Sequence, residues 1–160
     1  MRIAVHAVGR MKSGPEKELA ERYFERLARS GPAIGLEFAG VEESAESRLA
    51  TAAARRHEES RRLDAALASG AVLVLLDERG KSVDSEQFAE KLGGWRDSGR
   101  KSLIVAIGGP DGHDPALRAR ADMLLAFGAM TWPHQLVRIM VAEQLYRAAT
   151  ILSGHPYHRA

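Results

Sequence analysis

Two glycine-bearing stretches in the C-terminal third of the chain have the residue types from which a small-molecule pocket is built. The first is GGPDG at 108–112, which follows the apolar run 102–107. The second is FGAMTWPH at 127–134, which follows the apolar run 123–127. Because glycine has no Cβ, such loops can present backbone N–H and C=O groups to a ligand at close range.

Glycine and proline are also ordinary turn residues, so a plain strand-to-helix turn explains either loop equally well. Neither loop has the spacing G-x-G-x-x-G or G-x-x-x-x-G-K-[ST], which disfavours a common dinucleotide site and a P-loop. Each loop follows a predicted strand, however, and ligands of open α/β sheets bind outside the carboxyl ends of strands. We therefore expect both loops at one sheet edge, where they form one pocket.

The last residues, HPYHR at 155–159, bring two imidazoles, a phenol and a guanidinium together. Two imidazoles without a third ligand are weak support for a metal site, and we predict none. From 123 to 160 three Arg and three His stand against a single acid, Glu143. This local positive charge suits phosphate binding, although a solvated helix face is the plainer interpretation.

GGPDG, then GAMTWPHQLVRIMVAEQLYRA at 128–148, then HPYHR occur in this order in a chain of 160 residues. With these motifs the chain resembles the ribosomal large-subunit RNA pseudouridine N3-methyltransferases, a family of the SPOUT class. The resemblance implies an α/β fold with a mostly parallel sheet, helices on both faces and a C-terminal trefoil knot that forms the cofactor pocket. True knots are rare, so this expectation rests wholly on the resemblance.

The activity that the resemblance implies is S-adenosylmethionine-dependent methylation of N3 of a pseudouridine in 23S rRNA, on assembled ribosomes. The positions that match the family's cofactor-binding residues are Leu76, Gly108, Phe127, Gly128, Ala129, Met130, Thr131 and Trp132. Where many relatives have Leu-Ser and Leu, this chain has Phe127-Gly128 and Trp132. Binding through the backbone survives these changes, whereas a hydrogen bond from the missing Ser side chain does not.

Methylation of a ring nitrogen requires a group that accepts its proton and a group that stabilises the resulting anion. We predict Arg138, Tyr157, His158 and Arg159 as catalytic residues. His134 and His155 are further candidate proton acceptors, because an unperturbed imidazole titrates near neutral pH. Two alternatives stay open: Arg138 pairs with a carboxylate, and Tyr157 is either packed in the protein or stacked on a base.

The elements that position these residues alternate between strands and helices. We expect a single domain, 1–160, because this length buries one core. The patterns predict strands at 2–8, at 36–38 and, in the centre of the sheet, at 71–76. They predict helices from a capping box at Ser13–Glu16 to about Ser30, over 43–68, from Asp84 to about Ser98, and over 134–152.

The composition is that of an ordinary globular protein, with 45% hydrophobic and 28% charged residues. There is no cysteine, which excludes disulfides and thiolate chemistry. No apolar run approaches the length of a membrane span and no secretory signal is present, so we expect a cytoplasmic protein. The net charge of +2 argues against a surface that coats nucleic acid, and the Arg-rich segment 42–64 carries six acids against its five Arg.

The last helix is apolar almost all round, so we predict that both of its faces are buried and that one subunit hardly covers them. A homodimer with this helix at a two-fold interface satisfies the pattern and agrees with the family's habit. Two other functions stay open. One is a knotted ribosome-binding module without catalysis, and the other is a small α/β protein that holds a nucleotide phosphate in its glycine loops.

Overall fold

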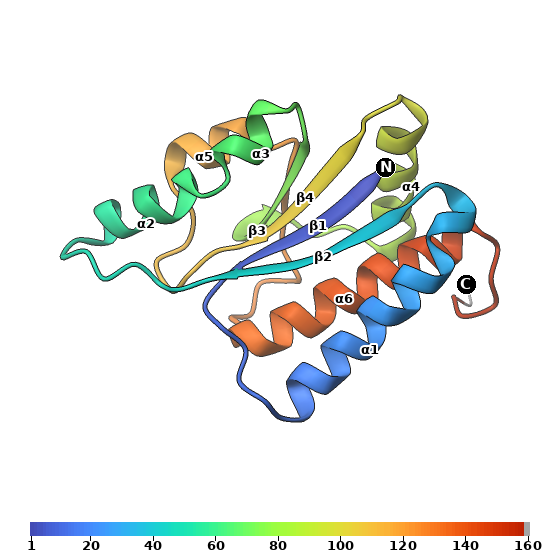
Figure 1. The fold of residues 1–160 in the computed structure, drawn as a ribbon, viewed down its shortest axis with the longest axis horizontal. Helices are drawn as coiled ribbons and strands as arrows, with labels where there is room; N and C mark the ends of the chain where they lie inside the picture. The colour runs from blue at the N-terminus through green and yellow to red at the C-terminus, as the bar shows by residue number, and fades with distance from the viewer. Residues whose placement is uncertain (159–160) are drawn as a thin grey trace.

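The computed structural model describes residues 1–158, which form a five-stranded sheet in the order β2-β1-β4-β3-β5 (Figure 1). All the described strand pairings are parallel. The strands are β1 (Arg2–Val8), β2 (Glu37–Ser44), β3 (Val72–Lys81), β4 (Ser102–Ile107) and β5 (Met123–Leu125). The predicted α/β class is therefore confirmed.

Helices cover both faces of this sheet. The helices are α1 (Pro15–Ser30), the 3-10 turn η1 (Pro32–Ile34), α2 (Ala52–Arg61), α3 (Asp64–Ala68), α4 (Ser85–Asp97), α5 (Pro115–Arg120) and α6 (His134–Leu152). Helices α1, α4 and α6 pack on one face, and α2, α3 and α5 lie over the other (Figure 1). Side chains of a strand point alternately to the two faces, so Val105 joins the first core and Ile104 the second.

Two predictions about the sheet and its flank were wrong. Strand β3 is not central, because β4 lies between β1 and β3 while β3 also pairs with β5. The predicted helix over 43–68 is instead the end of β2, an irregular segment and two short helices. Strand β2 continues to Ser44 because its backbone pairs with β1 as far as Val8, and this tertiary hydrogen bonding outweighs local helix propensity. Helix α2 then begins after its N-cap residue Thr51, whose side chain accepts a hydrogen bond from the Ala54 N–H.

The start signals of the other helices were predicted unevenly. Asp84 and Gln87 form the expected reciprocal cap of α4, with Asp84 accepting from the Gln87 N–H at 2.7 Å. The predicted capping box of α1 was wrong, since its N-cap is Gly14 and no side chain caps it. Helix α5, which the sequence patterns missed, is capped by Asp114 and has Pro115 at its start.

Helix α6 has the predicted bounds, and one chain covers more of it than we expected. Helices α1 and α4 lie against it, and Val141, Ala142 and Leu145 are fully packed. Only its first turns keep large apolar side chains at the surface, with Leu136 40% exposed. None of the helices in residues 1–158 is both long and apolar enough to cross a membrane.

Candidate functional site

A cleft opens where three parallel strands end side by side. Leu76 of β3 lies opposite Ile107 of β4 and Leu125 of β5. Both glycine loops leave the sheet at this edge and line a cleft of about 420 Å³. The prediction that the two loops meet at the carboxyl ends of their strands is confirmed.

Seven of the eight predicted cofactor residues line this cleft in the described chain. They are Leu76, Gly108, Phe127, Gly128, Met130, Thr131 and Trp132, and Ala129 is the one that does not. Gly128 has a φ of 98°, a backbone conformation that L side chains rarely adopt. The Trp132 indole N–H donates to the Phe127 carbonyl at 3.1 Å and ties the loop to itself. Backbone and apolar surface therefore form this side of the cleft.

Charged side chains form the opposite rim. Arg118 of α5 pairs with Asp77 at 2.8 Å, just after Leu76. The first glycine loop is held from outside by α2, because Arg55 donates two hydrogen bonds to the Asp111 carboxylate, at 2.6 and 3.0 Å. This contact holds the pKa of Asp111 below its usual range and raises that of Arg55. Helix α2 thus holds the first glycine loop through an ion pair. This role was not predicted from the sequence.

His113 is a further residue of the cleft that sequence reasoning missed. Its Nε2 lies 3.0 Å from the Leu76 carbonyl oxygen, and it lines the cleft behind Gly108. Burial, more than any other influence, lowers the pKa of the imidazole, which keeps the ring neutral. Its position next to GGPDG was the only available signal, since its partner is 37 residues away.

Arg138 does not line the cleft and pairs with Glu43 of β2, as one alternative had it. Its side chain is only 7% exposed, and it also donates to the Gly9 carbonyl at 3.0 Å. The N–H of Met11 donates to the same carboxylate at 3.0 Å. In the described chain Arg138 therefore joins the ends of β1 and β2 to α6.

Tyr157 and His158 of the tail pack at the other end of α6. The Tyr157 hydroxyl donates to Glu143 at 3.0 Å, its ring lies 4.8 Å from that of Tyr146, and burial raises its pKa. The Arg147 guanidinium, whose Nε bonds Glu143 at 2.9 Å, covers the Tyr157 ring. His158 Nε2 lies 3.3 Å from Glu86 of α4. Arg159 lies outside the described residues.

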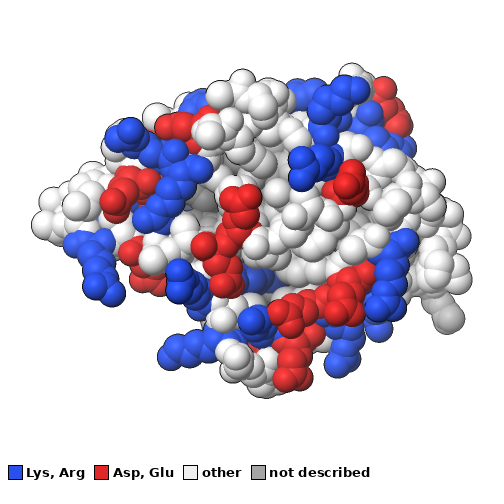
Figure 2. Space-filling model, viewed as in Figure 1, with Lys and Arg blue, Asp and Glu red and all other residues white. Residues whose placement is uncertain are grey.

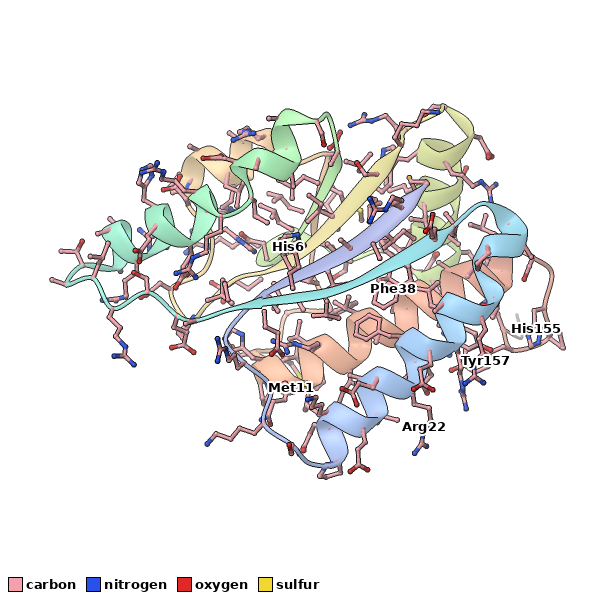
Figure 3. The ribbon with its side chains drawn as sticks, in the orientation of Figure 1. His6, Met11, Arg22, Phe38, His155 and Tyr157 are labelled. Atoms are coloured by element: carbon pink, nitrogen blue, oxygen red, sulfur yellow. The ribbon has the colours of Figure 1, made fainter. Side chains whose placement is uncertain are left out.

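The structure separates the tail from the cleft of the same chain. His134, at the start of α6, lines the cleft, whereas the tail follows the last turn. Tyr157 bonds Glu143, nine residues after His134, and at a rise of about 1.5 Å per residue these two helix positions lie about 14 Å apart along α6. Figure 3 shows Met11 and Tyr157 near opposite ends of this helix. The structure thus brings His134 and the cofactor residues together, but not Tyr157 and His158.

The surface charge is mixed. On the face drawn in Figure 2, basic and acidic side chains are interspersed over the helices and strands. Ion pairs such as Lys17 with Glu21 and Arg29 with Glu25 account for part of this pattern. No cluster of three or more His, Asp or Glu side chains within residues 1–158 is arranged to hold a metal ion.

Residues 1–158 match the family model described as "Predicted SPOUT methyltransferase". The chain belongs to this family. Among its relatives, the "Ribosomal RNA large subunit methyltransferase H" of Brucella anthropi is 65% identical over 160 residues, all of both chains. The protein of the same name from Mesorhizobium japonicum is 66% identical, again over all of both chains.

Among solved structures, the SpoU methyltransferase AviRb from Streptomyces viridochromogenes, in complex with AdoMet, aligns with a TM-score of 0.41 at 15% identity. The alignment covers 90% of this SPOUT chain and 56% of that one.

Proposed function

We propose that this SPOUT chain is an S-adenosylmethionine-dependent methyltransferase of large-subunit ribosomal RNA. Its target is N3 of a pseudouridine in 23S rRNA on the assembled ribosome. The observation that carries the proposal is the cleft at the carboxyl ends of β3, β4 and β5, built from the residues that the family resemblance assigns to the cofactor. The relatives that match over their whole length are named for action on the same RNA.

The residues of the cleft fit an adenosyl cofactor. Its volume of about 420 Å³ lies within the range of ordinary small-molecule sites. Backbone groups of Gly108 and of the loop from Phe127 to Trp132 are available for the polar edge of adenine. The side chain of Leu76 offers apolar surface for the ring face. The bound cofactor supplies an electrophilic methyl group on a sulfonium.

The chain's own residues must then remove the N3 proton and steady the ring anion as the N–CH₃ bond forms and the S–CH₃ bond breaks. His134 lines the cleft and serves in this proposal as a proton acceptor from the same chain. Tyr157, His158 and Arg159 supply base stacking, proton handling and phosphate binding from the tail. Arg138 stays a predicted anion-stabilising residue whose guanidinium rests on Glu43 in the free protein.

A second copy of the chain completes the site in this proposal. The described tail packs on the C-terminal half of α6, at Glu143, Tyr146 and Arg147, and not at the helix start beside the cleft, so in this proposal it serves the cleft of a partner. Large apolar side chains are exposed beside the cleft, with Met130 at 76%, Trp132 at 39% and Leu136 at 40%. We place the two-fold interface over these residues, at the start of α6. The trefoil knot, with α6 threaded through the preceding loop, belongs to the same proposal.

The test uses the whole protein, labelled S-adenosylmethionine and ribosomes from a strain that lacks its own enzyme for this site. We expect label in 23S rRNA of intact particles and little in free RNA, and calorimetric binding of S-adenosylmethionine but not of a nucleoside triphosphate. Cofactor binding without transfer would instead favour a non-catalytic ribosome-binding module. Preference for the triphosphate would overturn the methyltransferase assignment.

A further inference from the structure

The side of the cleft behind Gly108 contains a histidine that the proposed reaction leaves without a role. We propose that His113 is a positioning residue of the cofactor site, whose imidazole fastens β3 at Leu76 to the first glycine loop. This inference rests on the proposed function, because it assumes that the cofactor occupies the cleft. It assigns the ring no contact with the reacting atoms.

The hydrogen bond of the ring joins two strands that the cofactor must bridge. His113 follows GGPDG after β4, and its Nε2 lies 3.0 Å from the carbonyl oxygen of Leu76, the last residue of β3 that pairs with β4. A carbonyl oxygen only accepts, so the ring donates through its Nε2–H and the tautomer is fixed. The last carbonyl before the charged run from Asp77 is thereby satisfied within the protein. This hydrogen bond holds Leu76 in the position in which its side chain lines the cleft.

Gly108 fits closely against this ring. A Cβ placed on Gly108 would lie 3.1 Å from Cε1 of His113, tighter than most real Cβ contacts. The absence of a side chain at this position therefore serves the imidazole behind the loop as well as any ligand in front of it. The two residues form one wall, with His113 packed on the backbone that the cofactor approaches.

The same wall separates the cleft from a second cavity. This cavity, of about 100 Å³, lies under α2 and is also lined by Gly108 and His113. On its far side are the polar side chains of His6, Glu42 and Glu59. The imidazole thus lines both hollows, and its removal would take from the part-buried Leu76 carbonyl its side-chain donor and from the glycine loop its support. An unsatisfied buried acceptor costs enough free energy to rearrange a loop locally.

Three variants separate a positioning role from mere packing. His113→Phe keeps the size and planarity of the ring but removes the donor, whereas His113→Gln carries an amide N–H that can reach the same carbonyl. His57→Phe is the matched control, because His57 is a largely exposed imidazole of α2. Calorimetry with S-adenosylmethionine, thermal melting, and KM for cofactor and for ribosomes are measured on the whole protein.

We expect His113→Phe to weaken cofactor binding about tenfold or more, the equivalent of one lost buried hydrogen bond. We expect His113→Gln to recover most of this loss and His57→Phe to match the wild type. KM for the cofactor should rise in His113→Phe, while KM for ribosomes stays within about twofold.

Wild-type affinity in both His113 variants would overturn the inference, and so would an equal loss in both, because shape and not the hydrogen bond would then matter. If the wild-type protein itself failed to bind S-adenosylmethionine, the proposed function would fall first, and the inference with it. The wild-type titration therefore tells the two failures apart.

Discussion

The two ends of α6 carry different kinds of chemistry. At its start lies a cleft made mostly of backbone and apolar surface, next to exposed Met130, Trp132 and Leu136. On its C-terminal half Tyr157 is packed on Tyr146 and bonded to Glu143, and it does not line that cleft. In our proposal, cofactor binding needs one chain, whereas methyl transfer needs two.

The largest expected effect comes from removing one end. Deletion of residues 155–160 should leave folding and S-adenosylmethionine binding nearly intact, because the described tail residues pack on the C-terminal half of α6 and do not line the cleft. Transfer of label to ribosomes should fall by about a hundredfold or more, the usual contribution of acid–base groups. Calorimetry and the ribosome assay measure the two. Full activity of the truncated protein would remove the tail from catalysis.

Mixing experiments sharpen the comparison further. A tail-deleted chain and a Gly108→Val chain should each be inactive, the second because Val intrudes on the cleft wall and on His113. If the tail serves the partner's cleft, random mixing makes half of the dimers heterodimers with one working site of two, and activity should return to about a quarter of wild type. No recovery in a mixture shown to exchange subunits would place the tail and the cleft in the same chain.

Substitutions of Arg138 test whether this residue, near the start of α6, has a catalytic or a structural role. Arg138→Met should lower the free energy of unfolding by about 3 kcal/mol, because Glu43 is left without its partner. Arg147→Met should cost less, about 1 kcal/mol, because the Arg147 guanidinium is the more exposed of the two and Glu143 keeps its hydrogen bonds from Tyr157 and Gln144. Urea denaturation compares the two.

In the double variant Arg138→Met with Glu43→Met, part of the lost stability should return. If activity returned with it, Arg138 would be a structural residue only. If the double variant were stable but inactive, the predicted anion-stabilising role would gain support.

The smallest expected effect comes from the ion pair between Arg55 of α2 and Asp111 of the first glycine loop. The pKa of Asp111 is lowered by Arg55, so their contact stabilises the fold above the ordinary carboxyl pKa of about 3.9 and is lost as pH falls through the lowered value. Arg55→Met should therefore reduce the melting temperature slightly at pH 7. The difference from wild type should vanish at acid pH. A difference that persists there would point to lost packing and not to lost charge.

The strand ends were predictable because they depend on local patterns. The run before Gly108, the run before Gly128 and the bounds of α6 are all visible as uninterrupted apolar or helical spacing. The segment 43–68 was not predictable in the same way, since the hydrogen bonds of β2 with β1 decide it. Propensity favoured a helix where the sheet needed a strand.

The site divides along the same line. Seven of the residues that the family resemblance assigns to the cofactor line one cleft, because they belong to two contiguous loops and one strand. The partners of Arg138, Asp111 and His113 could not, because each lies 37 or more residues away in sequence. Pairings of this kind depend on which strands become neighbours, and no spacing along the chain encodes that choice directly.

The contact between α1 and α6 also bears on the order in which the molecule can assemble during synthesis. Helix α1 emerges among the first 30 residues and meets β2 early, through Phe24 and Phe38, but its largest contact is with a helix that ends at Leu152, so that part of its apolar face has no partner until the chain is almost finished. The central strand β4 likewise arrives after about two thirds of the chain. Contacts this distant in sequence form slowly, and the partly folded intermediates expose apolar surface that favours aggregation. A protein proposed to modify ribosomes thus completes its own core only when translation of its chain is nearly over.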